Sequence, residues 1–210
     1  MTSFKKYNLY LLISLLGPIL FSLGLYIYNY IPNLDYSILK VISHPGSTGL
    51  NKLSFICSWL GNYFVTVPTI IVASVLSVKK RWHYLAEMVL PVILSTLSCT
   101  ILKALIMRPR PICFGFNALA NEPFFSFPSG HTTGSTAFTL AFLIVFWQMS
   151  LKLTYKITCT VVGTLFVLLV AWSRLYNAVH FPSDIIGSFG LVIFFSFATL
   201  YTVESLRKQN

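Results

Sequence analysis

The stretch from Ile185 to Val203, IIGSFGLVIFFSFATLYTV, contains no charged residue. A helix of about 20 mainly apolar residues crosses the hydrocarbon core of a bilayer, so this stretch is typical of a transmembrane helix. Five similar charge-free runs precede it: Tyr7–Leu34, Leu53–Val78, Met88–Leu102, Thr132–Leu151 and Ile157–Ser173. The two shortest are expected to extend to Tyr84–Met107 and Lys156–Tyr176. The pattern predicts an all-α, polytopic membrane protein with six transmembrane helices.

The composition of the whole chain agrees with this interpretation. Of its 210 residues, 56% are hydrophobic and 10% are charged, whereas soluble domains have about 45–50% apolar and about 25% charged residues. This composition argues against a soluble globular protein, and it excludes a disordered chain, a collagen and a disulfide-rich secreted scaffold. No internal repeat or low-complexity tract divides the chain, so residues 1–210 are expected to form one integral-membrane domain.

The net charge of +10 arises from 15 Lys and Arg residues against five Asp and Glu residues. The positive charges form short clusters between apolar runs, and no block of like charges suggests a nucleic-acid partner. With the N-terminus inside, six spans leave nine positive residues inside and six outside, as the positive-inside rule requires. Four of the outer ones crowd the ends of the third and fifth helices and indicate an anionic ligand: Lys103, Arg108, Arg110 and Arg174.

Three segments at these outer ends carry residues suited to phosphate chemistry. The first is KALIMRPRP, from Lys103 to Pro111, in which two prolines end the helix and leave Arg108 and Arg110 on an extended exit. Lys supplies a point charge and Arg a planar fork that matches phosphate oxygens. Taken alone, the segment fits a helix anchored by snorkelling cations equally well.

The second segment, Phe127-Pro-Ser-Gly-His131, directly precedes an apolar run. Ser129 is expected to cap the helix, and Gly130 lets a ligand approach the first free N–H groups. This arrangement predicts an anion cradle with the His131 imidazole beside it. An ordinary capped helix with an exposed histidine is the alternative.

The third segment, SRLYNAVHFPSD, runs from Ser173 to Asp184 between the fifth and sixth helices. Pro182 is tolerated in a first helical turn, so His180 and Asp184 are expected about one turn apart on one face. A carboxylate so placed holds the imidazole in one tautomer and leaves its other nitrogen free to attack. A purely structural His–Asp pair is the alternative.

In order, the three segments resemble the signature of the type 2 phosphatidic acid phosphatase family: K-x6-R-P, P-S-G-H and S-R-x5-H-x3-D. The matching residues are Lys103 with Arg110-Pro111, Pro128 to His131, and Ser173-Arg174 with His180 and Asp184. Every defining position between residues 103 and 184 is filled. Arg108 is not a defining position, and we keep it as a candidate for supporting the site.

The resemblance implies a metal-independent lipid phosphatase without a cofactor, whose helical-bundle active site lies at the outer membrane face. By this resemblance, His180 is the nucleophile that becomes phosphohistidine, Asp184 orients it, and His131 is the general acid and then the base. The residues expected around the phosphoryl oxygens are Lys103, Arg110, Ser129, Gly130 and Arg174. The other acidic residues, Asp35, Glu87, Glu122 and Glu204, are scattered along the sequence and predict no metal cluster.

Lipids handled by the family include phosphatidylglycerol phosphate, phosphatidic acid, undecaprenyl pyrophosphate and lipid A phosphates. The motifs do not distinguish among them, nor do they separate a phosphatase from a phosphotransferase in which a second lipid replaces water. The compact size favours a bacterial inner membrane with the site facing the periplasm. An anion channel or transporter would need charges near the membrane midplane, and the related vanadium haloperoxidases are soluble, so both are disfavoured.

The loop Ile112–Phe127 is unusually aromatic for a solvated connection, with Phe114, Phe116, Phe124, Phe125 and Phe127. Aromatic rings settle at membrane interfaces, so this loop is expected to shape the entrance for a lipid headgroup. Packing of the rings on the helix ends is the alternative. Whether Cys57 and Cys113 form a disulfide is left open.

Overall fold

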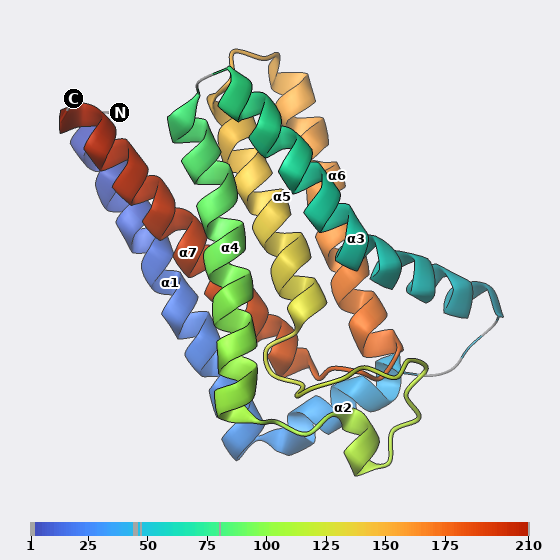
Figure 1. Cartoon of the computed structure of the whole chain (residues 1–210). Coiled ribbons are helices and arrows are strands. Elements are labelled where there is room, and N and C mark those ends of the chain that lie inside the picture. Colours follow the sequence, from blue (N-terminus) through green and yellow to red (C-terminus); the bar gives the residue numbers. More distant parts are fainter. Residues whose placement is uncertain (1–2, 44–45, 47, 80, 210) are drawn as a thin grey trace.

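Six long helices form the body of the protein (Figure 1). The structure, a computed structural model, describes residues 3–43, 46, 48–79 and 81–209, and every regular element in these ranges is helical, which confirms the all-α prediction. The elements are α1 (Ser3–Tyr30), α2 (Pro32–Ile42), α3 (Thr48–Val78), α4 (Trp82–Ile106), the 3₁₀ helix η1 (Pro111–Phe114), α5 (Gly130–Gln148), α6 (Leu153–Tyr176) and α7 (Pro182–Gln209).

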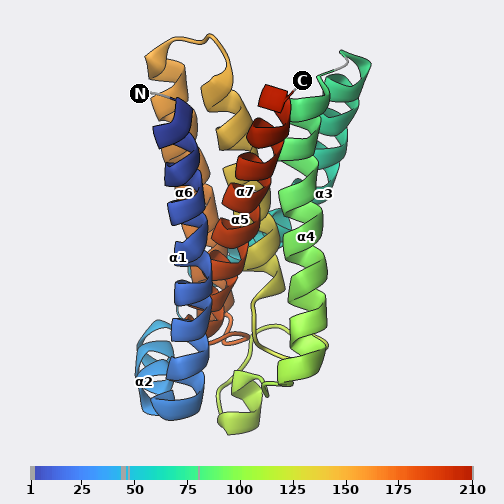
Figure 2. The ribbon, with the colours of Figure 1, turned by 90° about the vertical axis from the view of Figure 1, so that its left-hand side faces the viewer.

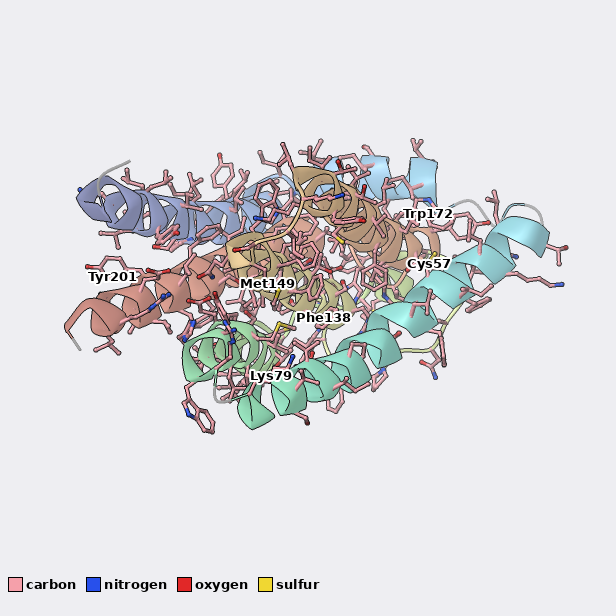
Figure 3. All side chains as sticks on the ribbon, turned by 90° about the horizontal axis from the view of Figure 1, so that it is seen from above. Cys57, Lys79, Phe138, Met149, Trp172 and Tyr201 are labelled. Atoms are coloured by element: carbon pink, nitrogen blue, oxygen red, sulfur yellow. The ribbon has the colours of Figure 1, made fainter. Side chains whose placement is uncertain are left out.

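The N- and C-terminal ends of the chain lie at one end of the bundle (Figure 1). In the middle, α5 packs against α3, α4, α6 and α7. At one edge α1 packs along α7 (Figure 2). On the opposite side α3, which carries Cys57 and ends next to Lys79, crosses at an inclination in the view along the bundle (Figure 3). The other end of the bundle carries α2, η1 and the connections 107–129 and 177–181.

Glycines set the spacing of the α1–α7 pair. A Cβ atom at Gly17 would lie 2.6 Å from the Gly190 carbonyl oxygen, and one at Gly190 would lie 2.5 Å from the Gly17 oxygen. Small residues let helix backbones approach closely, which is a common basis of helix association in lipid. Because α7 begins with the residues of the third motif, this packing also fixes the position of Asp184.

Within the part of the chain that the structure describes, four segments are long and apolar enough, by length and composition, to cross a membrane: Asn8–Tyr30, Trp82–Phe114, Leu153–Tyr176 and Pro182–Arg207. They coincide with four of the six predicted spans. The described parts of α3 and α5 do not reach this standard, and α5 in particular opens with small, buried and partly polar residues such as Thr132, Thr133 and Ser135. A crossing by all six helices therefore stays a prediction.

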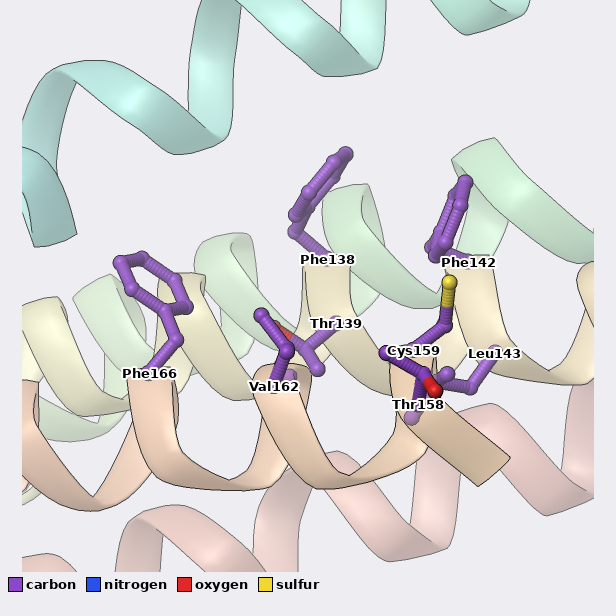
Figure 4. A pocket seen from close by; sticks show the side chains of 9 residues that line it. Phe138, Thr139, Phe142, Leu143, Thr158, Cys159, Val162 and Phe166 are labelled. Carbon is purple, nitrogen blue, oxygen red and sulfur yellow. The ribbon is translucent and has the colours of Figure 1, made fainter. Parts of the chain in front are cut away.

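The outward faces of the long helices are apolar, with exposed side chains such as Leu12, Ile19, Leu105 and Val162. Between α5 and α6, an apolar pocket of about 350 Å³ opens beside Phe138, Phe142 and Phe166 (Figure 4). Extended apolar surface of this kind marks contact with a membrane or a partner. None of the residues that line the pocket belongs to the three motifs.

One predicted boundary was wrong. The first apolar run was expected to continue to Leu34, but α1 ends at Tyr30 and a second helix, α2, begins at Pro32. Proline has no N–H to donate and restricts the residue before it, and Ile31 accordingly leaves the helical region with φ −133° and ψ 48°. The change of direction lays α2 across the ends of α6 and α7 and buries Asp35 there (Figure 1).

Candidate active site

The three motifs meet at the end of the bundle that carries α2. Lys103 lies in the last turn of α4, which ends where Met107 takes a left-handed conformation and donates its N–H to the Lys103 carbonyl at 3.0 Å. Arg110 follows on extended backbone, with φ −79° and ψ 162°. Ser129 caps the start of α5, and His180 and Asp184 flank the start of α7 at Pro182. Helix ends rather than helix middles therefore supply the site.

His180 and Asp184 form a buried pair. The His180 Nδ1 atom lies 3.3 Å from Asp184 Oδ2, and the two side chains are about 2% and 0% exposed. The same oxygen accepts the Phe181 N–H at 2.8 Å and the Ser126 hydroxyl. With a proton on Nδ1 toward the carboxylate, Nε2 is unprotonated and its lone pair accepts a long hydrogen bond from Arg110, whose Nη1 lies 3.5 Å away.

The surroundings of His180 keep its imidazole neutral. Burial lowers the pKa of His180 well below its usual value, and the charges of Lys103 and Arg110 lower it further. The hydrogen bond and charge of Asp184 act in the opposite direction and are outweighed. A neutral imidazole with an unprotonated Nε2 has the form that a nucleophile needs.

Behind Asp184 lies Arg108, which is 1% exposed. Its Nη1 donates to Asp184 Oδ1 and to the Ser183 hydroxyl, both at 2.6 Å, and its Nη2 donates to Asp35 Oδ2 at 2.7 Å. The guanidinium carbon lies 4.3 Å from the Tyr28 ring centre and 4.2 Å from that of Phe181. Arg108 thus contacts the predicted site residue Asp184 directly, and its supporting role stays a prediction.

Asp35 and Glu122, which are far from the motifs in the sequence, lie at the site in the structure. Asp35 accepts the Ser183 N–H at 2.9 Å and pairs with Arg108, and Glu122 pairs with Arg174. Sequence reasoning missed both residues because neither belongs to a motif. Asp35 could have been noticed because it places a carboxylate in a mainly apolar helical pattern after Pro32. Burying a carboxylate costs free energy unless it is paired.

The cations expected to bind phosphate are all held by one short stretch of the loop, residues 122–126, which we call the capping segment. Lys103 Nζ donates to the carbonyls of Phe125 at 2.6 Å and Ser126 at 3.2 Å. Arg110 donates to the carbonyls of Pro123 and Phe124, both at 2.9 Å. Arg174 pairs with the Glu122 carboxylate and donates to the Ser58 hydroxyl. Its Nε is buried without a hydrogen-bond partner among the described residues.

Glu122 is ionised in this setting. Burial alone would raise its pKa, but the charges of Arg174 and His131 outweigh burial, so the pKa of Glu122 is lowered. A carboxylate on Arg174 occupies the kind of position that a phosphate oxygen would take, because both are anionic acceptors matched to a guanidinium.

The start of α5 completes the site. Ser129 is fully buried and acts as the N-cap, accepting the Thr132 N–H at 3.5 Å and the Thr132 hydroxyl at 3.0 Å. A Cβ atom at Gly130 would meet only Lys103 Cε, at 3.9 Å, so the backbone faces the cations without obstruction. His131 is half-buried, and the charges that act on it are Arg174, Glu122, Arg110 and Lys103.

The aromatic loop divides into packed and exposed rings. Phe114 and Phe116 pack on Tyr36 and Phe181, with ring centres 5.4 to 6.4 Å apart. Phe127 is buried against Phe21. Phe124, in the capping segment, is 83% exposed and is the most exposed of these rings, and Ile112 and Phe114 also keep exposed apolar surface.

Two cysteines and the two other histidines of the chain lie outside the three motifs. Cys57 is buried and Cys113 exposed, and both are free thiols. His83 packs on the Tyr84 ring, with centres 4.0 Å apart, and His44 lies outside the described residues. Among the described residues, no group of three or more His, Cys, Asp and Glu side chains is placed to hold a metal ion.

A family model described as the PAP2 superfamily matches residues 82–208. Phosphatidylglycerophosphatase B of Bacillus subtilis (strain 168) is 31% identical over 173 residues, which cover 80% of this chain and 83% of the relative. An undecaprenyl-diphosphatase of Sulfolobus acidocaldarius is 25% identical over 170 residues, which cover 79% of this chain and 77% of the relative.

Two solved structures are similar over most of their length. A transmembrane PAP2-type phosphatidylglycerolphosphate phosphatase from Bacillus subtilis matches with a TM-score of 0.72 and 25% identity, over 95% of this chain and 96% of that one. LpxE of Aquifex aeolicus matches in fold with a TM-score of 0.65 and 22% identity, over 80% and 94%. Together with the apolar helices, these likenesses identify an integral membrane protein with the fold of membrane phosphatases.

Proposed function

The chain belongs to the PAP2 superfamily, and from this premise we propose that it hydrolyses a phosphomonoester or pyrophosphate of a membrane lipid through a phosphohistidine. The observation that carries the proposal is the His180–Asp184 pair, whose unprotonated Nε2 is directed toward Arg110. A nucleophile oriented by a carboxylate and directed toward clustered cations is what displacement at a phosphorus atom needs.

In the first step, His180 Nε2 attacks phosphorus, a P–N bond forms and the P–O bond to the lipid breaks. His131 donates a proton to the departing oxygen. In the second step His131 takes a proton from water, the water oxygen attacks phosphorus, and the P–N bond breaks. The products are the dephosphorylated lipid and inorganic phosphate, and both histidines return to their starting states.

Three cations neutralise the phosphoryl oxygens as charge shifts between them. Lys103, Arg110 and Arg174 are in place for this role, and the free N–H groups at the start of α5 add to it. For the oxygens to reach these donors, the capping segment must exchange its carbonyl and carboxylate contacts for contacts with the substrate. We expect this charge to suffice without a divalent metal.

Among the candidate substrates, phosphatidylglycerol phosphate and undecaprenyl pyrophosphate are favoured because relatives named for activity on them match most of the chain. Phosphatidic acid and lipid A phosphates follow. Transfer to a second lipid is the alternative, since it shares the first step. Release of inorganic phosphate from one purified lipid distinguishes hydrolysis from transfer.

The orientation follows from the charges. With all six long helices crossing a bacterial inner membrane and the N-terminus inside, the site end faces the periplasm and Lys79, Arg81, Lys152 and Arg207 lie on the cytoplasmic side, as the positive-inside rule requires. A cysteine placed at the exposed Asn117 should react with an impermeant thiol reagent added from outside. Labelling from the cytoplasmic side alone would overturn this orientation.

The decisive experiment measures phosphate release by the purified protein in detergent against these four lipids, with and without excess EDTA. We expect release from at least one lipid, no loss of activity in EDTA, and inhibition by vanadate, which adopts the five-coordinate geometry of the transition state. An acid-labile phosphate label should be trapped on the wild-type protein and absent from His180→Ala. A label that persists in that variant would overturn the phosphohistidine at His180.

A further inference from the structure

We propose that Asp35 and Arg108 are positioning residues that fix the Asp184 carboxylate, and through it the nucleophile His180. The inference rests on the proposed function, because it takes His180 as the nucleophile. Its basis is a chain of buried contacts that joins α2, the exit from α4 and the start of α7.

The two oxygens of Asp184 have separate partners. Oδ2 faces the catalytic side and contacts His180, Ser126 and the Phe181 N–H. Among the described residues, Oδ1 accepts a hydrogen bond from Arg108 alone, at 2.6 Å. Rotation of the carboxylate plane would break this bond, so Arg108 fixes the orientation in which the carboxylate faces His180.

Arg108 is held in turn by Asp35. One Asp35 oxygen contacts Arg108 at 2.7 Å and the Ser183 hydroxyl at 2.5 Å, and the other accepts the Ser183 N–H at 2.9 Å. Asp35 therefore fixes both the guanidinium and the first turn of α7. Asp35 and Asp184 are the only two aspartates of the chain, and both are used here.

The charge balance explains why the network has three members. A buried guanidinium requires anionic partners, and a single pair would leave Arg108 free to draw Asp184 away from His180. With Asp35 on its other side, the cation is shared between two carboxylates. Asp184 then keeps negative charge on the oxygen that faces the imidazole.

Asp35→Asn and Arg108→Gln test this directly, with p-nitrophenyl phosphate as a soluble substrate so that lipid entry plays no part. We expect kcat to fall about 10- to 100-fold in each, because small misplacements of a reacting group have effects of that size, while KM stays near the wild-type value. Arg81→Gln, an exposed arginine at the opposite end, is the matched control.

The pH profile separates positioning from mere destabilisation. The charged groups that act on His180 are Asp184 from α7 and Lys103 and Arg110 from α4 and its exit, with Arg108 behind Asp184. Loss of the Arg108 cation favours the imidazolium and moves the acid limb of kcat/KM to higher pH. Loss of the Asp35 anion disfavours the imidazolium and moves that limb to lower pH.

Arg108→Gln alone leaves two buried carboxylates without their cation and can fail to fold. The double variant Asp35→Asn/Arg108→Gln keeps the net charge of the network and therefore tests the proposal even in that case. We expect its acid limb near the wild-type pH with kcat still reduced. Folded variants with unchanged kcat, or with limbs that shift in the same direction, would overturn the proposal. Activity of His180→Ala would instead overturn the proposed function, so the two failures are distinguishable.

Discussion

On one side of the site, His180 and Asp184 are held by buried side chains from three parts of the chain, whereas on the other side Lys103, Arg110 and Arg174 are held mainly by the capping segment. Arg110 also donates to the Val179 carbonyl at 2.8 Å, and Arg174 to the Ser58 hydroxyl. The first set of contacts is shielded from solvent and charge-balanced. The second consists largely of backbone carbonyls and one carboxylate on a loop with an exposed tip at Phe124. This difference indicates that the nucleophile is held rigidly, whereas the groups that bind phosphate make contacts that a substrate can replace.

The largest effect should follow from His180→Ala, which removes the nucleophile from the rigid side. We expect a loss of at least about 10⁴-fold in kcat, as for nucleophiles in other covalent mechanisms, with expression and thermal unfolding preserved. His83→Ala, at the opposite end of the bundle, serves as the control. Turnover by His180→Ala close to the wild-type rate would show that His180 is not the nucleophile.

Arg174→Gln tests the exchangeable side. One donor to the transferring group is lost, so we expect kcat/KM to fall about 10²- to 10³-fold and vanadate inhibition to weaken in parallel. Steady-state kinetics and vanadate titration measure both quantities, with Arg207→Gln as the control. If vanadate bound equally well to this variant, Arg174 would not be a phosphate ligand.

The pH dependence tests the neutrality of His180. Because burial lowers its pKa, the imidazole should stay deprotonated as the pH falls through about 6.5, the value of an ordinary histidine. The acid limb of kcat/KM for p-nitrophenyl phosphate is therefore expected below that pH. An acid limb at or above pH 6.5 in the folded enzyme would show that burial does not lower the pKa of His180.

Glu122→Gln weakens one of the contacts that substrate must replace. The lowered pKa of Glu122 keeps it charged at neutral pH, where it competes with phosphate for Arg174. We expect vanadate to bind about two- to fivefold more tightly in the variant, the size expected for a partly exposed ion pair. Asn121→Ala, in the same loop, is the control. Weaker vanadate binding would mean that Glu122 orients Arg174 rather than competing for it.

The smallest effect is expected from Phe124→Ser/Phe125→Ser, which leaves the backbone carbonyls of the capping segment in place. KM for a lipid substrate should rise a few-fold, because the exposed ring no longer meets the bilayer, while hydrolysis of p-nitrophenyl phosphate is nearly kept. Ile112→Ser, another exposed apolar residue of the loop, is the control. Equal losses on both substrates would favour a packing role for the two rings.

Much of this arrangement follows from local sequence patterns. Apolar runs specify the long helices, Pro109 and Pro111 end α4, Ser129 caps α5, and the spacing of His180 and Asp184 brings them together across one turn. Each of these features depends on residues close in the chain, where helix periodicity and proline or capping chemistry act directly.

The partners of Asp35 and Glu122 were decided by the tertiary structure. Arg108 lies 73 residues after Asp35, and Arg174 lies 52 residues after Glu122, so no local pattern links either pair. The break at Pro32 turns α2 across the bundle, and the connection between α4 and α5 folds back over the cations. The sequence by itself determined which groups carry the chemistry, whereas the packing of the bundle determined which buried charges neutralise one another. The reason is that a buried ionised group can pair only with the partners that packing brings within reach.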